Sequence, residues 1–290
     1  MADQQVFTLI NPQTGNPAFK LLYFDHGHYF DSVQRNNYFS LIYITKGNGK
    51  IKADFSEYDF QQDTLFSFSP YQPYVFSSNN LQGIAIHFHS DFFCIHRHQP
   101  EIACSVLFTN IYLPPFTQIE EATATTLKML FEQMKTEIQK AALAQYEILV
   151  SYLKILLITA TRLKTEQQPL AQKKVQHLKE PFIIQNLKDA IEKGFKTKHS
   201  PGDYANALNI SAKALAKITK TYFNKTITDL ISERIIIEAK RELYLTNKTV
   251  KEIAYELGYQ DEYYFSRFFK TNTDISPQFY RETVGFEKGI

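Results

Sequence analysis

The sequence predicts a multidomain α+β protein whose N-terminal part is β-rich and whose C-terminal part is all-α. Short runs rich in Phe and Tyr, separated by turn signals, fill residues 1–119. Apolar residues recur at helical spacing in residues 120–166, and residues 181–290 contain two copies of a helix, turn, helix pattern. The polar residues 167–180 are the expected linker between the two parts.

The composition is that of a soluble globular chain. Its 290 residues allow about two domains with substantial cores, and its net charge of +2 is weak evidence for a nucleic-acid partner. We expect no membrane partner, because the chain opens without a basic and then apolar segment and its longest apolar runs, such as Ile155–Ile158, are too short. Two cysteines make no disulfide framework, so we expect a cytoplasmic protein.

The N-terminal strands are predicted from β-branched and aromatic runs bounded by turns. The clearest are Tyr38–Thr45, Lys50–Phe55, Thr64–Phe68 and Ile84–Phe88, with a glycine-rich turn at 46–50. Many short strands of this kind predict a sandwich or a small barrel.

Residues 120–164 predict a pair of helices interrupted near Lys140. The second helix is apolar over much of its circumference, which favours a dimer interface; packing against the N-terminal domain of the same chain is the alternative. The polar stretch Lys164–Pro169 predicts the break that precedes the C-terminal domain.

The stretch Thr249–Arg281 predicts a helix-turn-helix unit. Thr249 suits a helix cap, and Gly258 supplies the left-handed position that ends the first helix. The second helix has an apolar stripe of three phenylalanines, with polar side chains on its other side. Those polar groups suit DNA, since an arginine can donate two hydrogen bonds to guanine and a lysine suits phosphate. An ordinary helical hairpin with a solvated charged face is the alternative.

A second copy of this pattern precedes it. Ser200 can cap a helix with Pro201 at its first position, and Ser211 can cap a projecting helix over Ala212–Phe223. A long apolar helix over Ile227–Leu245 is expected to join the two units.

Over Pro181–Glu282 the sequence resembles the DNA-binding domain of the AraC/XylS family of transcription regulators. The matching segments are the linker-helix run RIIIEAKREL at 234–243, Ile253-Ala254, Leu257-Gly258-Tyr259, YFSRFFK at 264–270 and SPQFYR at 276–281. One departure is Asp274, where the family usually has Gly; we expect little harm, because Asp tolerates left-handed geometry.

The resemblance implies that the two projecting helices enter successive segments of the major groove of double-stranded DNA. Residue by residue, it places base-facing positions at Lys213, Ala216, Lys217, Glu262, Tyr263, Ser266 and Arg267. Lys270 suits phosphate, and the outward-facing Lys220 is a further DNA-binding candidate. Lys225 and Lys248 are other cations on whose positions the affinity could depend. Tyr259, Phe265 and Phe269 are assigned to the core, because duplex DNA offers no free base face.

The N-terminal domain resembles, more loosely, the cupin-like β-barrel that precedes this DNA-binding domain in many family members. Metal-dependent cupins carry His-x-His where this chain has Arg35-Asn36-Asn37, and a further His where it has Tyr74. We therefore expect no cofactor. A pocket lined by aromatic residues is predicted for a small-molecule effector, with aromatic residues that simply fill the barrel as the alternative.

A cluster of metal-competent residues remains, namely Cys94, His96, His98 and Cys104. Cys and neutral His can bind zinc, although the spacing matches no standard zinc motif, and the alternative is a polar loop with buried thiols. No nucleophile and base pair or phosphate-cradling loop indicates an enzyme.

These features together favour a transcription regulator with promoter DNA, a small-molecule effector and a second copy of itself as partners, and RNA polymerase if it is an activator. The competing hypothesis is a cupin-derived metal-binding protein or enzyme with a helical appendage.

Overall fold

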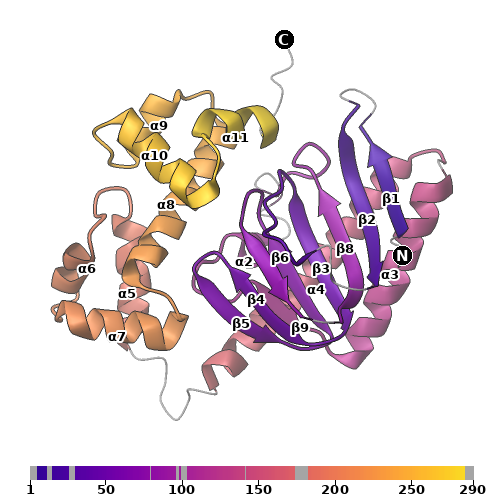
Figure 1. Ribbon diagram of the computed structural model, residues 1–290, viewed down its shortest axis with the longest axis horizontal. Helices are drawn as coiled ribbons and strands as arrows, with labels where there is room; N and C mark the ends of the chain where they lie inside the picture. The colour runs from indigo at the N-terminus through magenta and orange to yellow at the C-terminus, as the bar shows by residue number, and fades with distance from the viewer. Residues whose placement is uncertain are drawn as a thin grey trace. The chain divides into compact units, whose positions relative to one another are not determined.

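The computed structural model describes residues 5–11, 15–25, 30–78, 80–95, 98, 103–140, 142–173 and 182–284. The chain forms two compact units (Figure 1). The N-terminal unit comprises residues 1–110 and 114–168, and the C-terminal unit comprises residues 111–113 and 169–290.

The N-terminal unit is built from antiparallel strands in two sheets. Their order is β1-β2-β8-β3-β6-β9 in the larger sheet and β5-β4-β7 in the smaller one. The strands are β1 (Gln5–Ile10), β2 (Pro17–Asp25), β3 (Phe39–Lys46), β4 (Gly49–Ala53), β5 (Ser56–Phe60), β6 (Thr64–Phe68), β7 (Tyr74–Ser77), β8 (Gln82–Phe88) and β9 (Phe116–Gln118).

The larger sheet is buried on both faces, which explains why β3 is apolar without alternation. Ile42 and Ile44 face the smaller sheet, whereas Leu41 and Tyr43 belong to a second core on the opposite face. Between the sheets, aromatic rings pack on one another; the ring centroids of Phe68 and Tyr74, for example, lie 3.9 Å apart. These aromatic residues therefore fill much of the space between the sheets.

The predicted barrel is not closed. Among the described strands, no ladder of hydrogen bonds joins the two sheets, and an isolated bridge links Gln34 to Tyr74 of β7. The expected β-rich N-terminal domain is confirmed, and its strands form two sheets that share a core without closing into a barrel. The short strand β9, paired to β6, is where the larger sheet ends.

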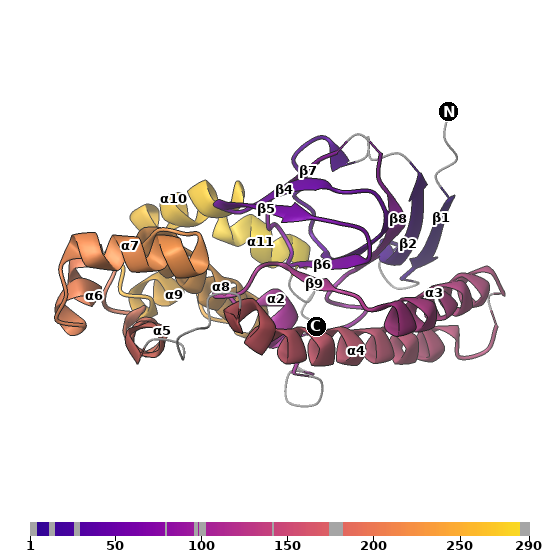
Figure 2. The same cartoon turned by 90° about the horizontal axis from the view of Figure 1, so that it is seen from below.

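Helices cover the outer face of the larger sheet (Figure 2). Helix α3 (Glu121–Lys140) contributes Leu127, Phe131 and Met134 to the core on that face, and α4 (Gln145–Lys173) contributes a row of leucines. A short helix, α2 (Ser105–Phe108), joins the same core. The predicted helical pair is thus present, and most of its apolar surface is used within the chain.

Helix α4 differs from the prediction at its end. It continues through Lys164–Pro169 to Lys173, so this polar stretch is helical. The boundary between the two compact units still falls within it, between Gln168 and Pro169. Lys164 is buried at the end of the core and donates a hydrogen bond of 2.9 Å to the carbonyl of Pro114. Lys164 is thus part of the packed N-terminal unit, although its charge is typical of an exposed linker residue.

The C-terminal unit is all-α. Its helices are α5 (Phe182–Gly194), α6 (Pro201–Ala207), α7 (Ala212–Phe223), α8 (Ile227–Leu245), α9 (Val250–Glu256), α10 (Glu262–Thr273) and α11 (Pro277–Val284). Helix α8 runs between two groups, α5–α7 and α9–α11, and packs against both (Figure 1). The predicted bounds of α7 and α8 are confirmed.

Within the residues that the structure describes, no helix combines the length and the apolar character needed to cross a membrane.

Candidate nucleic-acid interface

The second helix-turn-helix unit begins with a capping box on α9. The Thr249 hydroxyl accepts a hydrogen bond of 3.1 Å from the Glu252 amide, and the Glu252 carboxylate accepts one of 2.7 Å from the Thr249 amide. The hydrogen bonds from Thr249 lower the pKa of Glu252. Two of the amide groups at the helix start are thereby satisfied, and the predicted cap is confirmed.

The turn after α9 has the expected left-handed residue, with Gly258 at φ +84°. Tyr259 then donates its amide proton to the carbonyl of Ala254 across 3.0 Å. Asp261 caps α10 by accepting a hydrogen bond of 2.9 Å from the Tyr263 amide. The turn therefore ends one helix and starts the next within a few residues.

Helix α10 presents two different faces. Phe265 and Phe269 are fully buried, and Tyr259 packs its ring on Phe265 at 5.3 Å between centroids. The assignment of these three rings to the core is confirmed. On the other side, Tyr263 is 82% exposed, Arg267 and Lys270 are exposed, and Glu262 and Ser266 are half-buried.

The first unit repeats this construction. Ser200 and Asp203 form a capping box on α6, and Ser211 caps α7 by accepting a hydrogen bond of 3.2 Å from the Ala214 amide. Asn209 holds the left-handed position between the helices, with φ +52°. Leu215 and Phe223 hold α7 to the domain by burial.

The projecting face of α7 is a row of cations. Lys213, Ala216, Lys217 and Lys220 are all exposed. These residues lie at i, i+3, i+4 and i+7, which places them on one side of the helix. Within the described part of the chain, no ion pair engages the three lysines, so their charges are available to an anionic partner.

Two lysines that the sequence suggested for DNA have other roles. Lys225 is buried, and its Nζ donates hydrogen bonds to Glu233 at 2.7 Å and to the Ile111 carbonyl at 3.0 Å. Lys248 forms ion pairs with Glu256 at 2.6 Å and with Glu242 at 2.9 Å, and the hydrogen bonds with Glu256 and Glu242 raise its pKa. The expectation that affinity depends on these two lysines is not supported by their positions.

A chain of ion pairs runs along the surface of α8 and reaches Lys196 of the first helix-turn-helix unit. Glu238 accepts from Arg234 at 3.2 Å and from Arg241 at 3.0 Å, and Lys196 lies 3.6 Å from it. Burial raises the pKa of Glu238, but the three cations, Arg234 foremost, outweigh this effect and hold the pKa below its ordinary value. Glu238 is therefore a charged structural group, which sequence spacing alone did not indicate.

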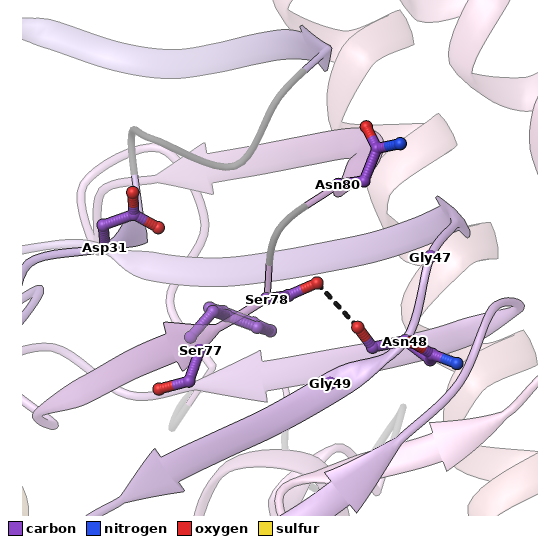
Figure 3. Close-up of a pocket in the computed structure, with 8 residues that line it drawn as sticks. Asp31, Gly47, Asn48, Gly49, Ser77, Ser78 and Asn80 are labelled. Atoms are coloured by element: carbon purple, nitrogen blue, oxygen red, sulfur yellow. Dashed lines mark hydrogen bonds between the residues drawn. The ribbon is translucent and has the colours of Figure 1, made fainter.

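The N-terminal unit has a hollow of about 690 Å³ at the edge of its sheets (Figure 3). It is lined mainly by polar residues from the β3–β4 turn and the end of β7: Asp31, Gly47, Asn48, Gly49, Phe76, Ser77, Ser78 and Asn80. The Ser78 hydroxyl donates a hydrogen bond of 2.6 Å to the Asn48 carbonyl, which ties the two segments together. Apart from the glycine-rich turn, no local pattern in the sequence indicates this hollow.

The cysteine and histidine cluster does not form a metal site among the described residues, where no group of three or more candidate ligands comes together. His96 lies outside the described residues. Cys94 and Cys104 are buried free thiols, and His98 stacks on the Phe93 ring. Burial raises the pKa of Cys104 to about 11, which makes it a poor thiolate.

The family to which the helical unit belongs follows from its sequence. A model for a helix-turn-helix domain of the AraC type matches residues 204–283, which span both units. The helix-turn-helix domain at residues 204–283 is of the AraC type. The matched residues include the projecting helices α7 and α10 and the helix α8 between them. The family model therefore covers the same two helix-turn-helix units that are described above.

Known relatives of the chain are also transcription regulators. The transcriptional activator Btr of Bacillus subtilis is 29% identical over 82% of this chain and 43% of its own length. The raffinose operon regulator RafR of Pediococcus pentosaceus is 30% identical over 33% of this chain and 34% of its own length. The chain thus matches less than half of either protein. The solved C-terminal domain of the response regulator AraT from Geobacillus stearothermophilus is 25% identical, with 39% of this chain and 94% of that one covered and a TM-score of 0.37.

Proposed function

We propose that the protein is a sequence-specific DNA-binding transcription regulator that engages double-stranded promoter DNA with α7 and α10. The observation that supports this most directly is the pair of similarly capped projecting helices in an AraC-type domain, each with an exposed polar face. One helix with an exposed charged face is common on protein surfaces. Two such helices on a shared linker helix are proposed to enter two successive major-groove segments.

The residues divide into two roles. Arg267 is proposed to donate to guanine, Glu262 to accept from cytosine, and Ala216 to touch a thymine methyl group, while Tyr263 and Ser266 complete the base-facing set. Lys213 and Lys217 face bases or phosphates at the first segment. Lys220 and Lys270 are proposed to bind phosphate, which positions the protein without distinguishing sequences.

The test is selection of duplexes from a random-sequence pool with the full chain, followed by binding titrations of the enriched sequence and a scrambled one over a range of salt. We expect enrichment of a site with two segments about one helical turn apart, and an affinity that falls steeply with salt. Binding that is absent, or equal for both duplexes, would contradict the proposal.

We further propose that a small-molecule effector binds in the hollow of the N-terminal unit. Among the described residues of the lining, Asp31 is the single charged one, and the other polar side chains are amides and hydroxyls from Asn48, Asn80 and the two serines. This lining favours a neutral polyhydroxylated molecule or an amine over an anion, because an anion would meet a carboxylate and no cation.

Thermal unfolding of the full chain with sugars, polyols and amines tests this site. A ligand that binds the folded state raises the melting temperature, and Asp31→Asn should reduce that rise. The control is Glu57→Gln, which changes an exposed carboxylate outside the hollow and should leave the rise unchanged. A rise of the same size in both variants would place the ligand elsewhere.

We also propose a cytoplasmic homodimer, with RNA polymerase as a partner if the outcome is activation. The relatives named above are transcription regulators, and Btr is named an activator. On α3 and α4, Met129 and Ile155 are 58% and 49% exposed and offer apolar surface beyond the intrachain core. Light scattering of the wild type and of Ile155→Arg tests the dimer, and an unchanged mass would exclude this face.

A further inference from the structure

The two helix-turn-helix units touch one another directly, in addition to sharing α8. The turn of the second unit lies on the backbone that connects α5 to α6. A Cβ atom on Gly258 would overlap the carbonyl oxygen of Lys196 and would come within 3.3 Å of the His199 ring. The rings of His199 and Tyr259 pack at 4.9 Å between centroids. We name these four residues, Lys196, His199, Gly258 and Tyr259, the joint.

Each side of the joint is held firmly by its own unit. On the first side, the Tyr204 hydroxyl donates to the Lys198 carbonyl at 2.9 Å, and the Lys198 amide donates to Gly194 at 2.8 Å. The guanidinium of Arg234 on α8 stacks over Phe195 at 3.9 Å from the ring centroid. A loop fixed in this way cannot yield to the second unit without breaking several contacts.

On the second side, Tyr259 is 7% exposed and contacts the rings of Phe265 and Phe268 on α10. A shift of Tyr259 would therefore move the projecting helix itself. The first unit offers an internal comparison, because Asn209 has the equivalent left-handed position with a full side chain. Left-handed geometry alone does not require glycine; close approach to Lys196 does.

We propose that the joint sets the angle and separation of α7 and α10, and thereby the spacing between the two DNA segments that the protein accepts. This inference rests on the proposed DNA-binding function. Its structural half, that the joint fixes the geometry of α7 and α10, can be tested without DNA; its functional half is the effect on DNA spacing. The joint adds a direct contact to the connection through α8, and its loss would let each helix-turn-helix unit tilt more freely on its half of that helix. The joint residues would then determine specificity without touching a base.

The structural half is tested by spin labels at Thr221→Cys on α7 and Thr271→Cys on α10 of the full chain, both of which are exposed positions. The distance between labels should be narrowly distributed in the wild-type background. His199→Ala, which removes the ring contact, should broaden that distribution about twofold, and His199→Phe, which keeps a ring, should restore it. Gly202→Ala is the matched control for Gly258→Ala, since a Cβ there meets an ordinary 3.7 Å contact.

The functional half uses the duplex selected by the wild type, with one or two base pairs inserted or removed between its segments. The wild type should prefer one spacing at least tenfold, and His199→Ala and Gly258→Ala should reduce that preference severalfold while His199→Phe and Gly202→Ala retain it. If a folded His199→Ala protein kept the label distances and the spacing preference of the wild type, the proposed role of the joint would be overturned and the DNA-binding function would stand. A wild type that binds no duplex, with label distances that respond as expected, would instead overturn the DNA-binding function.

Discussion

The two helix-turn-helix units share one backbone plan and differ in what their projecting helices expose. In both, a capping box starts the entry helix, a left-handed residue ends it, and the next amide donates to an alanine carbonyl: Ile210 to Ala205 in the first unit and Tyr259 to Ala254 in the second, each at 3.0 Å. Both projecting helices end at a left-handed residue, Asn224 or Asp274.

The exposed faces differ in charge and in hydrogen-bonding capacity. The first carries Lys213, Lys217 and Lys220, whereas the second carries Glu262, Tyr263, Ser266, Arg267 and Lys270. Lys217 and Arg267 occupy equivalent positions, but a lysine is a point charge and an arginine is a planar donor of paired hydrogen bonds. The difference indicates that the first unit mainly supplies attraction to the phosphate backbone and the second mainly supplies discrimination among bases.

The strongest effect is expected from the lysines of the first unit. Replacing Lys213, Lys217 and Lys220 with Ala should reduce the slope of log affinity against log salt by about 2.7, because each phosphate that a lysine neutralises contributes about 0.9. Replacing Lys46, Lys52 and Lys128 in the N-terminal unit removes the same net charge from exposed positions and serves as the control. Equal changes in slope for both triple variants would show that overall charge, and not α7, attracts DNA.

The next effect concerns discrimination by the second unit. Arg267→Ala should weaken the free energy of binding by about 1–3 kcal/mol for the duplex with the preferred base pair and by little for the other three duplexes. The reason is that the paired hydrogen bonds to guanine are removed. Lys217→Ala, at the equivalent position, should weaken binding to all four more evenly. Titrations on four duplexes that differ at one position measure this, and an even reduction for Arg267→Ala would assign Arg267 to phosphate.

A smaller effect tests the shared backbone plan. Thr249→Ala and Ser200→Ala each remove a helix cap, so each should lower the free energy of unfolding of the C-terminal domain by about 1 kcal/mol. Urea unfolding of the full chain, followed by helical signal, gives the value. Thr271→Ala, at an exposed position inside α10, is the control and should change little. A decrease at one cap and none at the other would mean that the units are not energetically alike.

The weakest effect is expected for Lys270→Ala, which should reduce the salt slope by about 0.9 and weaken binding to every sequence alike. Titration against the selected duplex and a scrambled duplex separates this result from the effect of Arg267→Ala. Weakening confined to the selected duplex would assign Lys270 to base contact.

The helical domain was largely predictable because its signals are local. Ser211 and Thr249 mark helix starts, Gly258 marks a helix end, and apolar spacing marks the buried faces, all within a few residues of one another. The N-terminal unit was less predictable. The strands β1, β2, β5, β7 and β9 have weaker patterns, and the continuation of α4 through Pro169 depends on burial of the helix against a distant sheet.

At the candidate site, too, the features that could not be predicted depend on contacts between residues that are distant in the chain. Exposure of Lys217 and Arg267 follows from helical spacing, but the ion pairs of Lys248 and the burial of Lys225 do not. The Lys225 ammonium group donates a hydrogen bond to the backbone carbonyl of Ile111, which is 114 residues away in the chain. Similarly, the glycine at position 258 is evident as a helix end, whereas its contact with Lys196 requires the fold.

If α7 and α10 act together on one DNA site, both segments of that site must contribute to the affinity. The decisive experiment compares the affinity of the full chain for three duplexes: the selected site, the same site with its first segment scrambled, and the same site with its second segment scrambled. Paired recognition predicts that both scrambled duplexes bind more weakly than the selected one, at least tenfold when the segment read by α10 is scrambled and by a smaller factor when the segment read by α7 is scrambled. Binding to all three should fall with salt. Equal affinity for the selected duplex and for either scrambled duplex would contradict it.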